Sequence, residues 1–130
     1  MRFTISTTVN ASAKEIYQLW LSGKGHSQMT GSKATGSTKV NGRFTAWDGY
    51  IAGRNLELRP FALIIQAWRT TEFAPGQDDS NLRIDLISVG TTKTKVTLTH
   101  SNLRHADMHY KRGWRDHYFA PMKEYFAVRR

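Results

Sequence analysis

The amino-acid sequence predicts an α+β fold in which a curved antiparallel sheet of about six strands wraps around one long C-terminal helix. Between residues 39 and 100, apolar residues mostly alternate with polar ones, which is the period of strands buried on one face. Between residues 110 and 126, aromatic and apolar residues return every fourth position, which is typical of a helix. The chain has 130 residues, and we expect them to form a single domain over 1–130.

The first part of the chain predicts one strand followed by helices. Residues 3–9 alternate apolar and polar side chains, as a half-buried strand does. Ser12 and Glu15 form a capping-box pattern, which marks the start of a helix. That helix has one apolar face, made of Ala13, Ile16, Tyr17 and Trp20. A short second helix is expected around residues 26–29, within a glycine-rich segment.

The middle of the chain predicts the remaining strands, near residues 43–47, 50–58, 62–70, 81–89 and 95–100. The segments between them carry residues that favour turns, namely Asp48-Gly49, Arg59-Pro60, Pro75-Gly76 and Gly90. Consecutive strands joined by short turns run antiparallel, because a parallel return needs a long crossover. We therefore expect a sheet with one apolar face that another element must cover.

The end of the chain predicts a helix that can cover this face. Its apolar stripe is made of Tyr110, Trp114, Tyr118, Met122 and Phe126. Asp107 is the expected N-cap, and Arg129 and Arg130 suit the negative end of the helix dipole. Pro121 cannot donate a backbone hydrogen bond, so we expect a bend near the middle. A helix of about 20 residues is about 30 Å long, and a sheet that curls around it commonly leaves a cavity.

Charge and composition limit the classes of partner. The chain has 19 basic and 10 acidic residues, a formal net charge of +9. This excess favours acidic or anionic partners, although solubility alone would also explain it. No nucleic-acid reader motif is present, so we expect no nucleic-acid partner. The N-terminus lacks the apolar core of a signal peptide, and no segment reaches the roughly 20 apolar residues that span a bilayer. We therefore expect a cytoplasmic protein without membrane insertion.

Patterns that would indicate catalysis or metal binding are incomplete. The chain has no cysteine, and no Gly-x-Ser-x-Gly sequence. His105 and His109 have a spacing that suits zinc on a helix, but no cysteine or well-spaced glutamate completes a ligand set. We predict no catalytic residues, no metal site and no cofactor.

Three motifs stand out in the last two-thirds of the chain, namely Trp47-Asp48-Gly49, Trp68-Arg69 and Gly113-Trp114. Together with the segments 44–53, 65–69, 113–119 and 122–126 around them, they resemble the C-terminal domain of activators of the heat-shock protein 90 ATPase. That family belongs to the START-like, or SRPBCC, helix-grip superfamily. The resemblance implies a cavity between the sheet and the C-terminal helix. It also implies a lipid, hormone or other apolar ligand, or a role in a chaperone or stress context, while a minority of the superfamily are enzymes.

The expected cavity residues come from both elements. We predict that the lining of a small-molecule site consists of Trp47, Trp68, Trp114, Tyr118 and Met122. Arg69 is the candidate anchor for an anionic group of the ligand. Stripes of aromatic residues are also typical of a core, and Arg69 also suits an ion pair with a strand carboxylate. Both readings of the aromatic set can hold at once.

A second candidate site lies near the start of the last helix. The basic residues Arg104, Lys111, Arg112 and Arg115 would offer a docking surface for a chaperone or another acidic protein, or form a solvated helix face. The sequence therefore predicts a non-enzymatic binding domain that holds an apolar small molecule, docks on a partner protein, or does both. The alternative is a cyclase-like or hydrolase-like enzyme that uses the same cavity.

Overall fold

The sheet in the computed structural model, which describes residues 1–127, has six strands. Their order across the sheet is β1-β6-β5-β4-β3-β2, and every neighbouring pair is antiparallel. The strands are β1 (Phe3–Val9), β2 (Arg43–Ala46), β3 (Ile51–Arg59), β4 (Leu63–Thr70), β5 (Ser80–Val89) and β6 (Lys93–Ser101). The predicted fold class is confirmed, and each predicted strand lies within two residues of the observed one.

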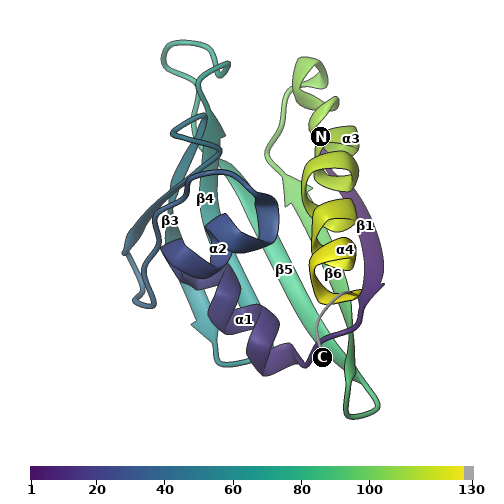
Figure 1. The fold of residues 1–130 in the computed structure, drawn as a ribbon. Helices are drawn as coiled ribbons and strands as arrows, with labels where there is room; N and C mark the ends of the chain where they lie inside the picture. The colour runs from purple at the N-terminus through teal and green to yellow at the C-terminus, as the bar shows by residue number, and fades with distance from the viewer. Residues whose placement is uncertain (128–130) are drawn as a thin grey trace.

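The N-terminal helices lie over the sheet (Figure 1). Helix α1 (Ala13–Leu21) begins as expected, because the Ser12 side chain accepts a hydrogen bond of 3.2 Å from the Glu15 backbone N–H. Helix α2 (Gly23–Thr30) is longer than the sequence indicates. Its glycine at position 25 does not break the helix but permits close packing, since a Cβ atom there would lie 2.8 Å from Leu19 Cα.

The last element is a continuous helical segment of three parts. These are α3 (Tyr110–Trp114), the π-helical turn η2 (Arg115–Phe119) and α4 (Ala120–Ala127). All five residues of the predicted stripe are buried, so the proposed packing of this helix against the sheet is confirmed. Arg129 and Arg130 lie outside the described residues.

The predicted N-cap of this helix is wrong. Asp107 ends a preceding 3-10 helix, η1 (His105–Asp107), and its carboxylate accepts hydrogen bonds from the Arg104 backbone N–H and from the Arg104 and Gln77 side chains. His109 occupies the N-cap position of α3 without a side-chain capping bond. Asp107 therefore stabilises the connection between β6 and the helix. Its carboxylate bonds the start of η1 and not the start of α3.

The π-helical turn explains how the stripe stays buried over its whole length. A regular α-helix advances about 100° per residue, so a repeat of four residues drifts by about 40° at each step. From Tyr110 to Phe126 the drift would reach about 160° and turn one end of the stripe away from the sheet. A π turn adds residues to one turn and offsets this drift. It lies directly before Pro121, whose missing N–H leaves an α-helical hydrogen bond unmade. The irregularity expected near Pro121 thus takes the form of η2.

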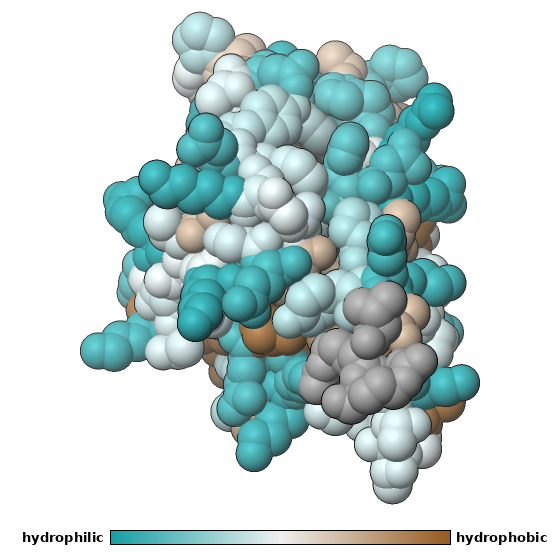
Figure 2. Space-filling model, in the orientation of Figure 1, coloured by the Kyte–Doolittle hydropathy of each residue, from teal (hydrophilic) through white to brown (hydrophobic). Residues whose placement is uncertain are grey.

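The core lies between the sheet and the helical layer, and apolar side chains from both form one cluster. On the face of the molecule in Figure 2, hydrophobic residues occupy only small separate areas. No helix among residues 1–127 is long and apolar enough to cross a membrane.

Candidate functional site

A pocket of about 670 Å³ lies between the first half of the final helix and one end of the sheet. Six aromatic side chains form most of its wall, namely Trp47, Tyr50, Trp68, Tyr110, Trp114 and Tyr118. The exposed residues His109, Arg112, Asp116 and His117 form its mouth. Its volume is within the range of sites that bind small molecules.

Strand register brings the sheet side of the pocket together. Ile51, the first residue of β3, pairs with Thr70, the last residue of β4. Trp68 pairs with Ser80 at the start of β5. From the final helix and its N-cap, residues 109, 110, 112, 113, 114, 116, 117 and 118 line the pocket. The pairs 109–110, 113–114 and 117–118 recur every fourth residue, which is the one-face spacing of a helix. The pocket therefore needs both the antiparallel sheet and the long helix.

A buried histidine, His100 on β6, holds two of the tryptophan walls. The Trp114 indole N–H donates to His100 Nδ1 at 3.0 Å, and because an indole only donates, Nδ1 carries no proton. His100 Nε2–H then donates to Ser80 Oγ at 2.8 Å, and Ser80 donates to the Trp68 carbonyl at 2.7 Å. Burial lowers the pKa of His100 to about 3, although Asp107 opposes this effect. The neutral ring thus links the Trp114 side chain to the Trp68 backbone, and both of its nitrogens are hydrogen-bonded.

A second buried histidine, His26 on α2, holds Tyr118. His26 Nδ1–H donates to the Trp20 carbonyl at 2.9 Å, so Nε2 accepts from the Tyr118 hydroxyl at 2.8 Å. Burial lowers the pKa of His26 and raises the pKa of Tyr118, so both groups stay neutral. Trp20 packs behind this pair, with its ring centroid 5.1 Å from that of Tyr118.

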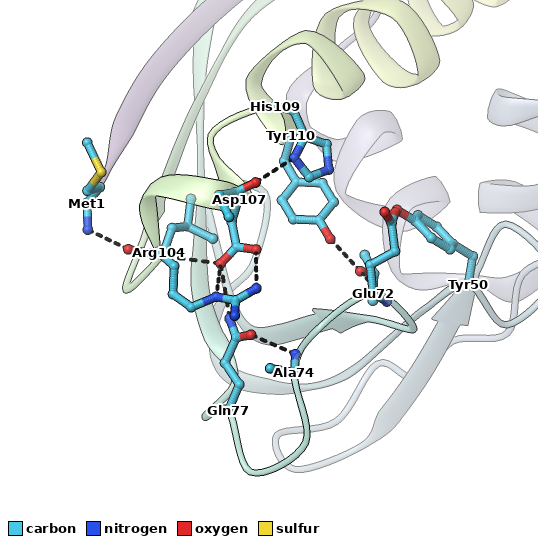
Figure 3. Close-up of polar contacts among 12 residues, drawn as sticks. Met1, Tyr50, Glu72, Ala74, Gln77, Arg104, Asp107, His109 and Tyr110 are labelled. Carbon is cyan, nitrogen blue, oxygen red and sulfur yellow. Dashed lines mark hydrogen bonds and ion pairs between the residues drawn. The ribbon is translucent and has the colours of Figure 1, made fainter.

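Two tyrosine hydroxyls are held by the segment at the end of β4, residues 70–72. The Tyr110 hydroxyl hydrogen-bonds to Thr70 Oγ1, and Tyr50 donates to the Glu72 carboxylate. Figure 3 shows these two side chains approaching the segment from opposite sides. Burial raises the pKa of both phenols, and the bond to Glu72 raises that of Tyr50 further. The hydroxyl groups of these two wall residues are thus occupied by their neighbours.

Trp47 differs from the other walls because its backbone is strained. It lies in the β2–β3 turn with a φ of 53°, followed by Asp48 at 56° and Gly49 at 90°. Such a conformation costs about 1 to 3 kcal/mol for a bulky residue. Its buried indole N–H has no hydrogen-bond partner of acceptable geometry among the described residues. It lies near enough to the Tyr118 hydroxyl to oppose the burial that raises the pKa of that phenol. Residues in this combination of strain and unmet hydrogen bonding cluster at binding sites.

Comparison with known proteins decides the family. The model of the family described as Activator of Hsp90 ATPase homolog 1-like protein matches residues 10–127. The chain belongs to this family. No curated protein matches the chain.

Solved structures agree with the family on the fold. An HSP90 activator from Plasmodium falciparum is 23% identical with a TM-score of 0.81, over 92% of this chain and 91% of that one. The Aha1 dimer from Colwellia psychrerythraea is 18% identical with a TM-score of 0.80, over 98% and 97%. CalU16 from Micromonospora echinospora is 16% identical with a TM-score of 0.78, over 98% and 76%. The resemblance predicted from the motifs is confirmed.

Each of the three motifs on which the resemblance rests has a residue at the pocket. The structure brings together four predicted cavity residues, Trp47, Trp68, Trp114 and Tyr118, in one wall. The two other predicted residues do not line it. Arg69 forms an ion pair with Asp79 at 2.7 Å, and Met122 is fully buried in the core beyond the pocket. Arg69 therefore follows the alternative reading of the sequence, an ion pair at the sheet.

The predicted basic residues divide between two situations. Arg104 and Arg112 pair with carboxylates of their own segment, Asp107 at 3.2 Å and Asp116 at 3.3 Å. Lys111 and Arg115 have no acidic partner among residues 1–127. Arg112 also lines the pocket, so one residue predicted for partner docking belongs to the mouth of the ligand site.

Sequence reasoning missed the histidine supports and part of the lining. His26 and His100 looked like ordinary polar residues, although His100 occupies an inward position in an alternating strand, which is the available signal. Tyr50 and Gly113 were noted only as parts of motifs. In the part of the chain that the structure describes, no three His, Cys, Asp or Glu side chains are placed to share a metal ion.

Proposed function

We propose that the protein is a non-enzymatic binding protein that holds an apolar small molecule in this pocket. The observation that carries the proposal is the aromatic wall around about 670 Å³, in which buried hydrogen bonds hold the side chains of Tyr110, Trp114 and Tyr118 in place. A pocket formed before the ligand arrives reduces the entropy lost on binding. Membership of the family agrees with a binding role.

The hydrogen bonds of the two buried histidines support binding over catalysis. His100 and His26 are neutral and hydrogen-bonded on both ring nitrogens. A general acid or base must reach the reacting atom of a bound substrate. These two histidines instead position the tryptophan and tyrosine walls.

Gly113 offers a direct test. It lies within the lining face of α3, and a Cβ atom built on it meets no atom within 4 Å. We expect Gly113→Leu to fill the pocket and abolish binding, while Gly113→Ala fills little of it and retains binding. Native mass spectrometry of each variant purified from the source organism would detect a retained ligand, and thermal shift with apolar compounds would give its effect on stability. Equal ligand retention by both variants would contradict the proposal.

Docking on a chaperone is a second candidate, favoured by two cations on the final helix that have no acidic partner among residues 1–127. Lys111 and Arg115 are four residues apart, and Lys111 is half-buried whereas Arg115 is exposed. An acidic partner surface would be attracted to them. A relative of this fold is described as an HSP90 activator, which names the chaperone to test. We expect Lys111→Glu with Arg115→Glu to weaken such binding in calorimetry, and no binding by the wild type would reject this candidate.

A cyclase-like or hydrolase-like enzyme that uses the same cavity remains the alternative, because Asp116 and His117 stand at the mouth. Such an enzyme would release a changed compound, so mass spectrometry of the ligand before and after incubation separates it from a binding protein. We expect the ligand to be recovered unchanged.

We also expect the protein to act in the cytoplasm.

A further inference from the structure

We propose that the ligand is a flat aromatic molecule with an anionic group, its rings packed against the wall of tryptophan and tyrosine rings and its charge held by Arg112 at the mouth. This inference rests on the proposed function of the pocket and specifies the chemistry of its ligand. It uses two independent observations, the arrangement of the wall rings and the residues at the mouth.

The wall rings present carbon surfaces in fixed orientations. Trp114 and Trp68 have centroids 5.5 Å apart at 41°, and Trp114 and Tyr118 are 4.7 Å apart at 49°. The Trp114 N–H and Tyr118 O–H point to buried histidines, so these polar edges are not offered to a ligand. Aromatic pairs are more favourable than their buried area alone implies. A flexible alkyl chain gains no such additional stabilisation and loses rotational freedom when it is held against fixed rings.

The mouth selects the charge of the ligand. Arg112 has a side chain 89% exposed, and its contact with Asp116 is 3.3 Å long. Exposed pairs of this kind contribute little, so Arg112 can turn to a ligand anion at small cost. His109 and His117 add two further hydrogen-bonding rings at the same mouth. Arg112 therefore takes the anchoring role that the sequence assigned to Arg69.

An organic cation is the competing ligand, because aromatic walls also attract cations. Asp116 is the single carboxylate among the pocket residues, and it already pairs with Arg112. The net charge of +9 raises the local concentration of anions and lowers that of cations. The balance of charge therefore favours an anion.

Calorimetric titration with four probes tests both parts. The probes are 2-naphthoate, the neutral 2-naphthylmethanol, a naphthylmethyl-trimethylammonium cation, and undecanoate, which has as many carbon atoms as 2-naphthoate but no ring. We expect 2-naphthoate to bind about tenfold more tightly than undecanoate, since one favourable ring contact contributes about that factor. We also expect 2-naphthoate to bind more tightly than the trimethylammonium cation.

Arg112→Ala and Arg115→Ala form a matched pair, because each removes one positive charge from the same helix and Arg115 does not line the pocket. Loss of a charge-assisted hydrogen bond should weaken 2-naphthoate binding about tenfold or more in Arg112→Ala. The Arg115→Ala change should stay within about twofold because solvent screens a remote exposed charge. Binding of 2-naphthylmethanol should be the same in both variants.

The outcomes separate this inference from the proposed function. If undecanoate or the cation binds as tightly as 2-naphthoate and Gly113→Leu abolishes that binding, the pocket is a ligand site but the inference is wrong. Equal weakening of 2-naphthoate by the two arginine variants overturns the role of Arg112. If none of the four probes binds, both the inference and the proposed function fail.

Discussion

The two halves of the final helix are both buried, but they contact their surroundings in different ways. In the first half, which we call the hollow half, Trp114 and Tyr118 are linked to polar partners on other elements and border the pocket, with 2% and 3% of their surfaces exposed. In the second half, which we call the filled half, Met122 and Phe126 are fully buried in the core. Side chains in a filled core are held by neighbours on every side, whereas those that border a pocket have fewer neighbours on the pocket side. Hydrogen bonds to His26 and His100 supply the missing constraint.

The largest effect is expected in the filled half. Met122→Ala removes a buried side chain from a close-packed region, and we expect it to lower the free energy of unfolding by about 2 to 5 kcal/mol. Urea denaturation would measure this loss. Ligand binding by the folded protein should be unchanged, and a loss of binding without loss of stability would show that Met122 belongs to the pocket after all.

The second-largest effect is expected on acidification, which should destabilise the hollow half. His100 has a pKa of about 3 in the folded protein, against an ordinary value near 6.5, so between these values the unfolded chain binds a proton that the folded chain does not. Stability therefore falls as pH falls through this window, by about 2 kcal/mol between pH 6 and pH 4.5 for this residue alone. His26 and Asp107, whose pKa values are also lowered, act in the same direction.

Chemical denaturation at several pH values measures this slope. In His100→Leu, which cannot take up the proton, the slope should be smaller over the same range. An equal slope in the wild type and in this variant would mean that His100 does not control the acid sensitivity of the fold.

A smaller loss is expected when one hydrogen bond of the hollow half is removed. Tyr118→Phe keeps the ring but leaves His26 Nε2 without its donor, which should cost about 1 to 3 kcal/mol. The near-ultraviolet circular dichroism of the neighbouring tryptophans should change as well, since Trp20 and Trp114 contact this ring. An unchanged spectrum together with unchanged stability would show that packing alone holds Tyr118.

The smallest effect is a gain. Gly113→Ala replaces glycine inside α3 with a strong helix former and adds a methyl group in open space. We expect stability to rise by about 1 kcal/mol or less, measured as an increase in melting temperature. Any loss of stability would show that position 113 is more crowded than the pocket implies.

The burial of both halves of the helix can be predicted from the sequence. The spacing of Tyr110, Trp114, Tyr118, Met122 and Phe126 predicts which side of the helix is buried, because that depends only on the repeat. It does not reveal which of these residues face a space and which fill the core. For this reason the sequence predicts Met122 as a pocket residue together with Trp114 and Tyr118, whereas the structure places it in the core.

The hollow half depends on contacts between distant segments, which a single sequence does not encode locally. Tyr118 and His26 are 92 residues apart, and Trp114 and His100 come from different elements. Arg69, the predicted anchor for an anion, follows Trp68 in β4, and neighbours in a strand point to opposite faces, so Arg69 pairs with Asp79 instead of lining the pocket. The motif around Trp47 was recognised, but its positive φ was not, since nothing local forces a tryptophan into that region.

The π-helical turn between the two halves fixes their rotational phase. Relative to an uninterrupted α-helix, a π turn is equivalent to one inserted residue, and one residue corresponds to about 100° of rotation. Deleting a single residue from Arg115–Phe119 would therefore rotate one half against the other, so that either the pocket or the core loses its side chains. Substitutions preserve this phase. The lining can then diversify position by position among relatives, whereas changes in length within this turn should be rare.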